Sequence, residues 1–198
     1  MDVLMHEKVI QEVLSLAKEF GGDEKANKKA MVRRCRVIVS EIYSPPKVCA
    51  LASKLCDLGI DPGVSLDLTT YDEEGHPWDF TKKRMRDKAE RLFDETEPDL
   101  LKGSPPCTWW SAWQRLNHSK NFPRDWKKFK REMQEAKIHL AFVCKLYRKQ
   151  MQAGRLFLHE HPASASSWKE SVVKNVYAND DVEKIIMHQC AYGQRSAK

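Results

Sequence analysis

Short apolar runs alternate with longer stretches of helical periodicity along most of this chain. We predict strands at 37–41, 64–67, 99–103 and 155–162, and helices at 47–58, 81–95 and 126–152. Strands that alternate with helices form a mostly parallel sheet, because each connection must cross back to the edge where the first strand began. The predicted fold class is therefore α/β, with a Rossmann-like, mostly parallel sheet flanked by helices.

The residues before the first predicted strand form a separate element. Apolar positions between Val3 and Phe20 follow a 3.6-residue period, and Gly21-Gly22 follows them, which predicts an amphipathic helix with a glycine stop. The chain has 198 residues, of which 41% are hydrophobic, enough material for one core. We therefore expect an N-terminal helical extension over 1–30 and one α/β domain over 31–198.

Membrane and secreted proteins are not indicated. The apolar runs are far shorter than the roughly 20 residues of a membrane-spanning helix. Acidic residues are scattered through the first 18 positions, unlike a secretory signal. The six cysteines include no CxxC pair, so we expect free thiols. We expect an intracellular protein, cytoplasmic or nuclear, with no membrane association.

Polar residues stand where the predicted strands end. The carboxyl ends of parallel strands meet at one edge of a sheet, and ligands bind there. Glu41, Asp67, Cys107 and Glu160 would all lie at this edge. Two prolines precede Cys107; they fix the backbone and would hold the thiol out from the edge, as suits a nucleophile. The alternative is a small packing residue in a turn.

A local excess of basic residues follows the Cys107 segment. The chain carries a net charge of +6, and between residues 120 and 131 basic side chains alternate with Phe122, Trp126 and Phe129. Basic side chains can contact phosphates, and aromatic rings can stack on bases. The alternative is an ordinary solvated helix face. The basic residues predicted to contact nucleic acid are Lys120, Arg124, Lys127, Lys128, Lys130 and Arg131.

The segment around Cys107 resembles the catalytic motif of the DNA (cytosine-5) methyltransferases. Residues 98–111 read P-D-L-L-K-G-S-P-P-C-T-W-W-S, and the usual form in that family is P-D-L-L-x-G-G-P-P-C-Q-x-F-S. Residues 157–162, F-L-H-E-H-P, look like the family's E-N-V strand. The resemblance implies that Cys107 is the nucleophile, that Glu160 is the partner of cytosine N3, and that Ser111 lies at the nucleic acid.

Further segments are similar to the family's other motifs, in the same order. Residues 78–81, W-D-F-T, resemble the G-D-I-T segment, whose aspartate contacts the cofactor adenine, and residues 191–195 are similar to Y-G-V-P-Q-x-R. The family's first loop, F-x-G-x-G, is here E-I-Y-S-P-P, and prolines cannot make the close approach that glycines allow. The resemblance implies that S-adenosylmethionine is bound in another geometry, with contacts from Glu41, Tyr43, Ser44, Asp67, Asp79 and Pro105.

The implied function is methylation of cytosine in DNA, or in RNA, through a covalent Cys107 adduct. A partner protein or a further C-terminal region would supply target recognition. Two alternatives stay open: a catalytically inactive nucleic-acid-binding protein of the same fold, and another enzyme whose cysteine adds to pyrimidine C6, as in thymidylate synthases. We expect no metal site, because we expect His159 and His161 to lie on opposite strand faces and not to converge.

Overall fold

Four strands form a single sheet in the computed structural model, which describes residues 36–111, 114 and 125–192. They are β1 (Val37–Ile42), β2 (Ile60–Leu66), β3 (Leu100–Gly103) and β4 (Leu156–His159), in the order β2-β1-β3-β4. Every neighbouring pair is parallel. The predicted helical extension over 1–30 lies outside the described residues.

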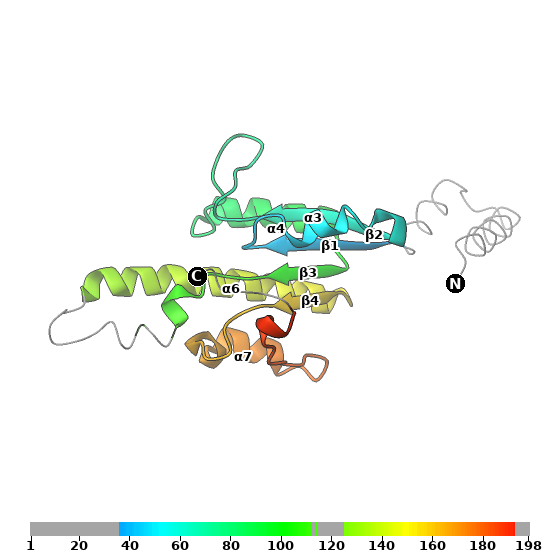
Figure 1. The fold of residues 1–198 in the computed structure, drawn as a ribbon. Coiled ribbons are helices and arrows are strands. Elements are labelled where there is room, and N and C mark those ends of the chain that lie inside the picture. Colours follow the sequence, from blue (N-terminus) through cyan, green and yellow to red (C-terminus); the bar gives the residue numbers. More distant parts are fainter. Residues whose placement is uncertain (1–35, 112–113, 115–124, 193–198) are drawn as a thin grey trace, which may run out of the picture.

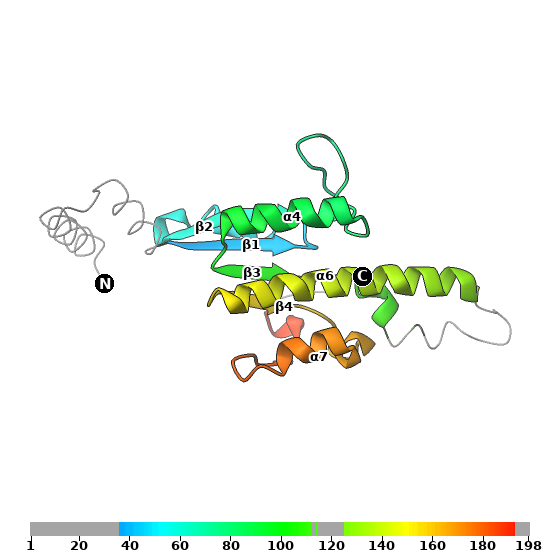
Figure 2. The same ribbon diagram turned by 180° about the vertical axis from the view of Figure 1, so that it is seen from behind.

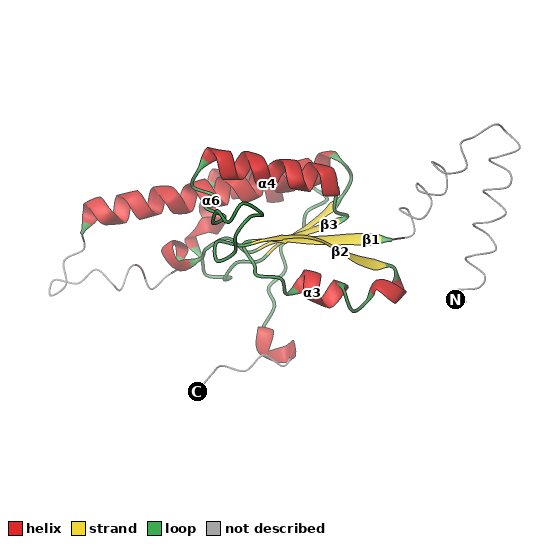
Figure 3. Cartoon of the chain, turned by 90° about the horizontal axis from the view of Figure 1, so that it is seen from above, coloured by secondary structure: helices red, strands yellow, loops and turns green. Residues whose placement is uncertain are grey.

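Helices connect the strands and cover the sheet (Figure 1). They are α3 (Val48–Ala52), α4 (Lys83–Thr96), α6 (Trp126–Gln152) and α7 (Ser171–Tyr177), with short 3₁₀ turns between them. Viewed along the sheet, α3 lies on one face, and α4 and α6 lie on the other (Figure 3). The predicted α/β, Rossmann-like architecture is confirmed.

The helix after β1 is shorter than predicted. The pattern over 47–58 indicated one helix, but α3 ends at Ala52 and a separate 3₁₀ turn covers Cys56–Leu58. The Ser53 hydroxyl donates to the Cys49 carbonyl (2.9 Å), a local bond that competes with helix continuation. Gly59 follows the turn with a φ of 76°, a left-handed value that favours glycine.

The core lies between the sheet and the two helices α4 and α6. Its fully buried side chains come from both layers: Ile42, Phe80, Leu101, Leu140, Val143 and Tyr147. Ion pairs at the rim join the two helices, with Lys145 and Lys149 of α6 lying 2.6 and 3.1 Å from Glu90 of α4. The C-terminal half of α6 is therefore fixed to both the sheet and α4.

The helix α6 is much longer than the strands beneath it. Its 27 residues extend about 40 Å, whereas the six residues of β1 extend about 20 Å. Because α6 runs antiparallel to the strands, its N-terminal part projects beyond their carboxyl ends (Figures 1 and 2). Neither α6 nor any other helix in the described part of the chain is long and apolar enough to cross a membrane.

Gly103, the last residue of β3, lies directly against α6. A Cβ atom at this position would overlap the Tyr147 hydroxyl and lie 2.7 Å from Cγ2 of Val143. We predict that Gly103→Ala lowers the free energy of unfolding by about 1–3 kcal/mol, because the packed helix cannot move away freely. Urea unfolding checks this value. Lys102→Ala is the control, with an expected change below about 1 kcal/mol; equal effects would mean that the contact is not tight.

Candidate active site at the carboxyl edge of the sheet

The strands end in one row across the sheet. Ile42 of β1 pairs with Gly103 of β3, which pairs with His159 of β4. Backbone bonds extend this row by one residue, since the N–H of Ser104 donates to Ile42 (3.1 Å) and that of Glu160 donates to Gly103 (2.9 Å). The connections reverse direction between β1 and β3. Such a switch point is where open α/β sheets bind their ligands.

Cys107 lies just beyond this row, on the loop after β3. The N–H of Trp110 donates to the Cys107 carbonyl (3.0 Å), closing the 3₁₀ turn η2 (Thr108–Trp110). Pro105 is buried and anchors the loop, whereas Cys107 is exposed. Glu160 follows the neighbouring strand β4 and is exposed too. The structure therefore brings Cys107 and Glu160 to the same corner of the edge.

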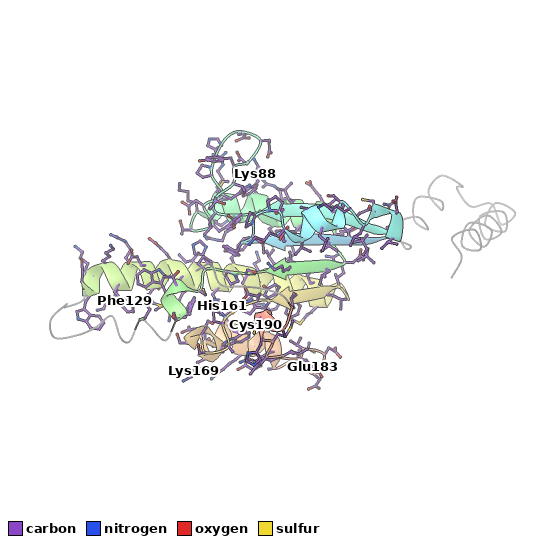
Figure 4. All side chains as sticks on the ribbon, in the orientation of Figure 1. Lys88, Phe129, His161, Lys169, Glu183 and Cys190 are labelled. Carbon is purple, nitrogen blue, oxygen red and sulfur yellow. The ribbon has the colours of Figure 1, made fainter. Side chains whose placement is uncertain are left out.

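His161 connects the loops that follow β3 and β4. Its Nδ1 atom lies 2.5 Å from the buried Ser167 hydroxyl. Burial lowers the pKa of His161, while Glu160 and the carbonyls of Pro105 and Pro106 act in the opposite direction. A neutral imidazole is thus held against the loop that leads to the thiol. Figure 4 shows His161 close to the end of β4.

His159 and His161 lie on the same side of the chain, contrary to the expectation. They are two residues apart, and alternate residues of an extended chain share a face; their ring centroids are 5.5 Å apart. The Tyr147 hydroxyl lies 3.1 Å from Nδ1 of His159, and Trp168 packs edge-on against this ring at 5.3 Å. Within the described residues, the Nε2 atoms of both histidines have no hydrogen-bond partner.

Metal-ligand atoms converge elsewhere, in the turn between β2 and α4. Those of Asp72, Glu74 and His76 lie within 4.8 Å of one another. The Asp72 carboxylate already accepts the backbone N–H groups of Glu74 (3.0 Å) and His76 (2.7 Å) and pairs with Lys88 (2.8 Å). The Lys88 hydrogen bond, opposed by burial, lowers the pKa of Asp72 to about 2. This network stabilises the turn around Lys88 (Figure 4).

Glu41 is fully buried near the end of β1, beside the switch point. Its Oε1 atom accepts the N–H groups of Lys47 and Cys49, both at 2.9 Å, and so holds the start of α3. Its Oε2 atom and the Oγ atom of Ser104 have no hydrogen-bond partner in the part of the chain that the structure describes. Glu41 pairs with Lys102, so Glu41 and Ser104 share a face of the sheet. A polar ligand could satisfy both atoms.

Two other predicted cofactor residues turn inward. Tyr43 has a left-handed φ of 58°, and its hydroxyl lies 3.2 Å from Nδ1 of His139 in the core. Burial raises the pKa of Tyr43 well above its usual value. Ser44 is buried, and its hydroxyl donates to the Pro45 carbonyl (3.0 Å). The Tyr43 ring therefore belongs to the core and does not line the edge.

The two predicted aspartates are each engaged by a nearby threonine. Oδ1 of Asp67 accepts hydrogen bonds from the N–H (2.9 Å) and hydroxyl (2.5 Å) of Thr69. Oδ1 of Asp79 accepts the same pair from Thr81, at 3.0 and 2.6 Å. Although burial acts to raise it, these bonds and the ion pair with Lys82 lower the pKa of Asp79. The other oxygen of Asp79, Oδ2, lies 3.3 Å from Nζ of Lys82, whereas Oδ2 of Asp67 is left to contact a ligand.

The predicted nucleic-acid contacts lie at the projecting end of α6. Four are exposed and form no salt bridge with any described residue: Lys127, Lys128, Lys130 and Arg131. Asp125 caps the helix there by accepting the N–H of Lys128 (3.0 Å). Ser111 is half-buried directly after η2. Lys120 and Arg124 lie outside the described residues.

Aromatic rings join this basic segment to the Cys107 loop. Trp109 of η2 packs on Phe129 of α6 with ring centroids 5.8 Å apart, and Phe129 packs on Trp126 at 5.9 Å. Both contacts are edge-to-face, and 51% of Trp126 remains exposed. Phe129 marks the projecting end of α6 in Figure 4. The turn that begins at Cys107 therefore rests on the basic end of the helix.

Sequence reasoning missed two polar residues of this edge. Ser104 stands where the related motif has glycine, and a polar residue directly after a strand end was the signal for it. Ser167 lies in a 3₁₀ turn, Ser166–Lys169, that no apolar period marks. Comparison of the chain with protein-family models, with curated proteins and with solved structures finds no match. The fold and this edge define a Rossmann-like α/β protein with a candidate site at its switch point.

Thiol reactivity should separate Cys107 from the core cysteines. Burial, with Glu41 nearby, raises the pKa of Cys49 to about 11, and burial raises that of Cys144 to about 12. We predict that iodoacetamide at pH 8 modifies Cys107 at least about tenfold faster than either, because only a thiolate reacts. Peptide mass spectrometry gives the rates. In urea the three should react alike, and equal rates in the folded protein would contradict the prediction.

Acid should destabilise the protein through His159. Burial lowers its pKa to about 4, whereas an unfolded histidine titrates near 6.5. Between these pH values the unfolded chain binds a proton that the folded chain does not, so stability falls as the pH falls. From pH 7 to pH 5, we predict a loss about 2 kcal/mol larger in the wild type than in His159→Phe. Urea unfolding at both pH values measures this loss. The control is His188→Phe, an exposed position, which should lose as much stability as the wild type. An equal loss in His159→Phe would refute the prediction.

Proposed function

We propose that this protein is a cytosine-5 methyltransferase-like enzyme that acts on nucleic acid, with DNA as the first candidate. One observation carries the proposal: Cys107 and Glu160 follow neighbouring parallel strands, at the same edge of the sheet. In the resemblance noted above these residues are the nucleophile and the acid. A nucleic-acid substrate also agrees with an intracellular, cytoplasmic or nuclear, location.

Each of the two side chains has a defined chemical task. The Cys107 thiolate adds to C6 of cytosine, and the electrons of the C5–C6 double bond move to C5. Glu160 donates a hydrogen bond or a proton to N3 as the thiolate adds. After C5 is methylated it loses its proton to a base such as water, the sulfur leaves C6 as the Cys107 thiolate, Glu160 takes back any proton given to N3, and the double bond is restored.

The residues at the switch point fit the implied cofactor. S-adenosylmethionine, when bound, would supply the methyl group that C5 accepts. Its amino and hydroxyl groups are donors that the unpartnered Oε2 of Glu41 could accept, and Ser104 offers a hydroxyl on the same face. Asp67 would contribute its free oxygen, Asp79 would contact the cofactor through the oxygen that it shares with Lys82, and buried Pro105 would support the loop after β3. Tyr43 would act only as a support within the core.

The basic end of α6 supports a nucleic-acid partner. The exposed lysines and arginine of its first two turns have no anionic partner in the described residues, and they lie next to the turn that starts at Cys107. Phosphates would release counterions from this surface and bind in a salt-dependent manner. His161 would position the loop, since it lies between Ser167 and the carbonyls that precede the thiol.

A second candidate is a catalytically inactive nucleic-acid-binding protein. The loop after β1 favours this candidate. Tyr43 and Ser44 turn inward there, and Pro45 and Pro46 stand where the resembled family has glycines. This candidate keeps the basic end of α6 and needs neither the thiol nor the cofactor. Binding of S-adenosylmethionine distinguishes the two candidates.

Covalent trapping tests the proposed chemistry directly. We predict that DNA containing 5-fluorocytosine forms a stable adduct with the wild type in the presence of S-adenosylmethionine, because fluorine replaces the C5 proton and cannot leave as a cation. Cys107→Ala should abolish the adduct, and Glu160→Gln should slow its formation at least about tenfold, the lower end of general acid–base contributions. Denaturing electrophoresis with labelled DNA measures both.

The control for the nucleophile is Cys190→Ala, because Cys190 is the other exposed thiol among the described residues. It should trap DNA as the wild type does. Calorimetry with S-adenosylhomocysteine completes the test, with weaker binding expected for Glu41→Gln. If no adduct forms and no cofactor binds, the enzyme proposal is overturned and the inactive nucleic-acid-binding protein is favoured.

A further inference from the structure

We propose that the nucleic acid bound at this edge is single-stranded, and that Trp126 stacks on its unpaired bases. The inference rests on the proposed function in one respect, the use of the basic end of α6 as a nucleic-acid surface. It adds the substrate class, which neither the fold nor Cys107 specifies. Aromatic geometry, charge distribution and the position of the thiol support it.

The aromatic rings form a continuous row that leads away from Cys107. Trp109 stands two residues after the thiol, Phe129 packs on it at 5.8 Å, and Trp126 packs on Phe129 at 5.9 Å. Both contacts are edge-to-face, the common arrangement of aromatic pairs. Half of Trp126 is exposed although the core lies within reach of the same helix. A stacking platform explains why a ring of this size stays at the surface.

Charge on α6 divides between its two ends. Lys145 and Lys149, in the C-terminal half, are neutralised by Glu90 and Asp94 of α4. The basic side chains of the first two turns have no such partner among the described residues, and in the sequence they stand beside Trp126 and Phe129. The unpaired positive charge and the exposed ring therefore occur at the same end of one helix. Basic residues around an aromatic platform are the usual elements of single-strand binding.

Unpaired bases distinguish this surface from one that binds a duplex. In a duplex the bases are stacked on each other and present only their edges, so an exposed indole would find phosphates and sugars but no free face. In a single strand each base can stack on an aromatic ring, with an energy of about 1–3 kcal/mol per base. Cys107 gains as well, because attack at C6 requires a base outside the stack, and a single strand offers one without the cost of flipping.

Binding to labelled oligonucleotides tests the inference with the full chain. Oligothymidylate and oligouridylate of about 15 nucleotides, close to the site size of known single-strand binders, contain no cytosine, so binding is measured apart from methyl transfer. The third probe is the thymidylate strand paired with its complement. Fluorescence anisotropy at fixed salt should show single strands bound at least about fivefold tighter than the duplex.

Variants test whether the preference for single strands comes from the Trp126 ring. Trp126→Ala should weaken single-strand binding at least about fivefold and leave duplex binding within about twofold, whereas Trp126→Phe should restore most of the affinity. The matched aromatic control is Tyr71→Ala, since Tyr71 is 68% exposed in the turn after β2. The triple change of Lys127, Lys128 and Lys130 to Glu should weaken both probes and flatten their salt dependence. Its charge-matched control changes three exposed lysines elsewhere: Lys54, Lys169 and Lys174.

The outcomes separate this inference from the proposed enzyme. Equal or tighter binding of the duplex, or a Trp126→Ala protein that binds single strands normally, would overturn the single-strand inference even if the 5-fluorocytosine adduct forms. A preference for single strands that depends on Trp126, without any adduct, would support the single-strand inference and reject the proposed enzyme activity. Tighter binding of oligothymidylate would identify DNA as the bound single strand, and tighter binding of oligouridylate would identify RNA.

Discussion

The close contact between Gly103 and α6 determines how the rest of the edge is arranged. With no side chain at the end of β3, the Tyr147 hydroxyl can lie against the strand and reach His159 on β4 at 3.1 Å. One residue of the helix thereby contacts two neighbouring strands at the row where they end. The contact fixes the axial position of α6, and this position determines how far its N-terminal turns project past the sheet.

Several buried polar atoms gather at this row without partners among the described residues. They belong to Glu41, Ser104, Trp110, His159 and His161, and the only other such atom in the described residues is Nε of Arg36. A buried polar group without a hydrogen bond costs about 1–3 kcal/mol, so such groups are rare in a core and are found where a ligand or water completes the site. Glu41 and Ser104 lie at the switch point between β1 and β3, the position expected for a ligand in this fold.

The sequence predicted the regular part of the fold well, for a physical reason. Apolar periodicity is strong where a segment packs on one side, so the bounds of α6, Trp126–Gln152, and the existence of all four strands followed from the pattern. The pattern was less informative where side chains bond to the local backbone. Ser53 donates to the Cys49 carbonyl and the helix after β1 ends there, and α7, Ser171–Tyr177, is too short to show a period.

The site was predictable in position and less so in detail. Strand ends placed Glu41, Cys107 and Glu160 at one edge, but the pattern could not show that the Tyr43 ring folds into the core to meet His139. The expectation for His159 and His161 was wrong, because residues two apart on an extended chain share a face. Their neighbours Tyr147 and Ser167 come from distant segments, and only tertiary packing brings them there.

The division of α6 into two halves allows binding and chemistry to depend on different residues. Its C-terminal half is held by the core and by ion pairs to α4, so the helix axis is fixed before any ligand arrives. Lys127 and Trp126 are exposed on the projecting half, and their substitution should therefore change affinity without disturbing the row at Gly103 and Glu160. A rigid helix that extends past the sheet is a direct way to hold a strand near a thiol that belongs to a different element.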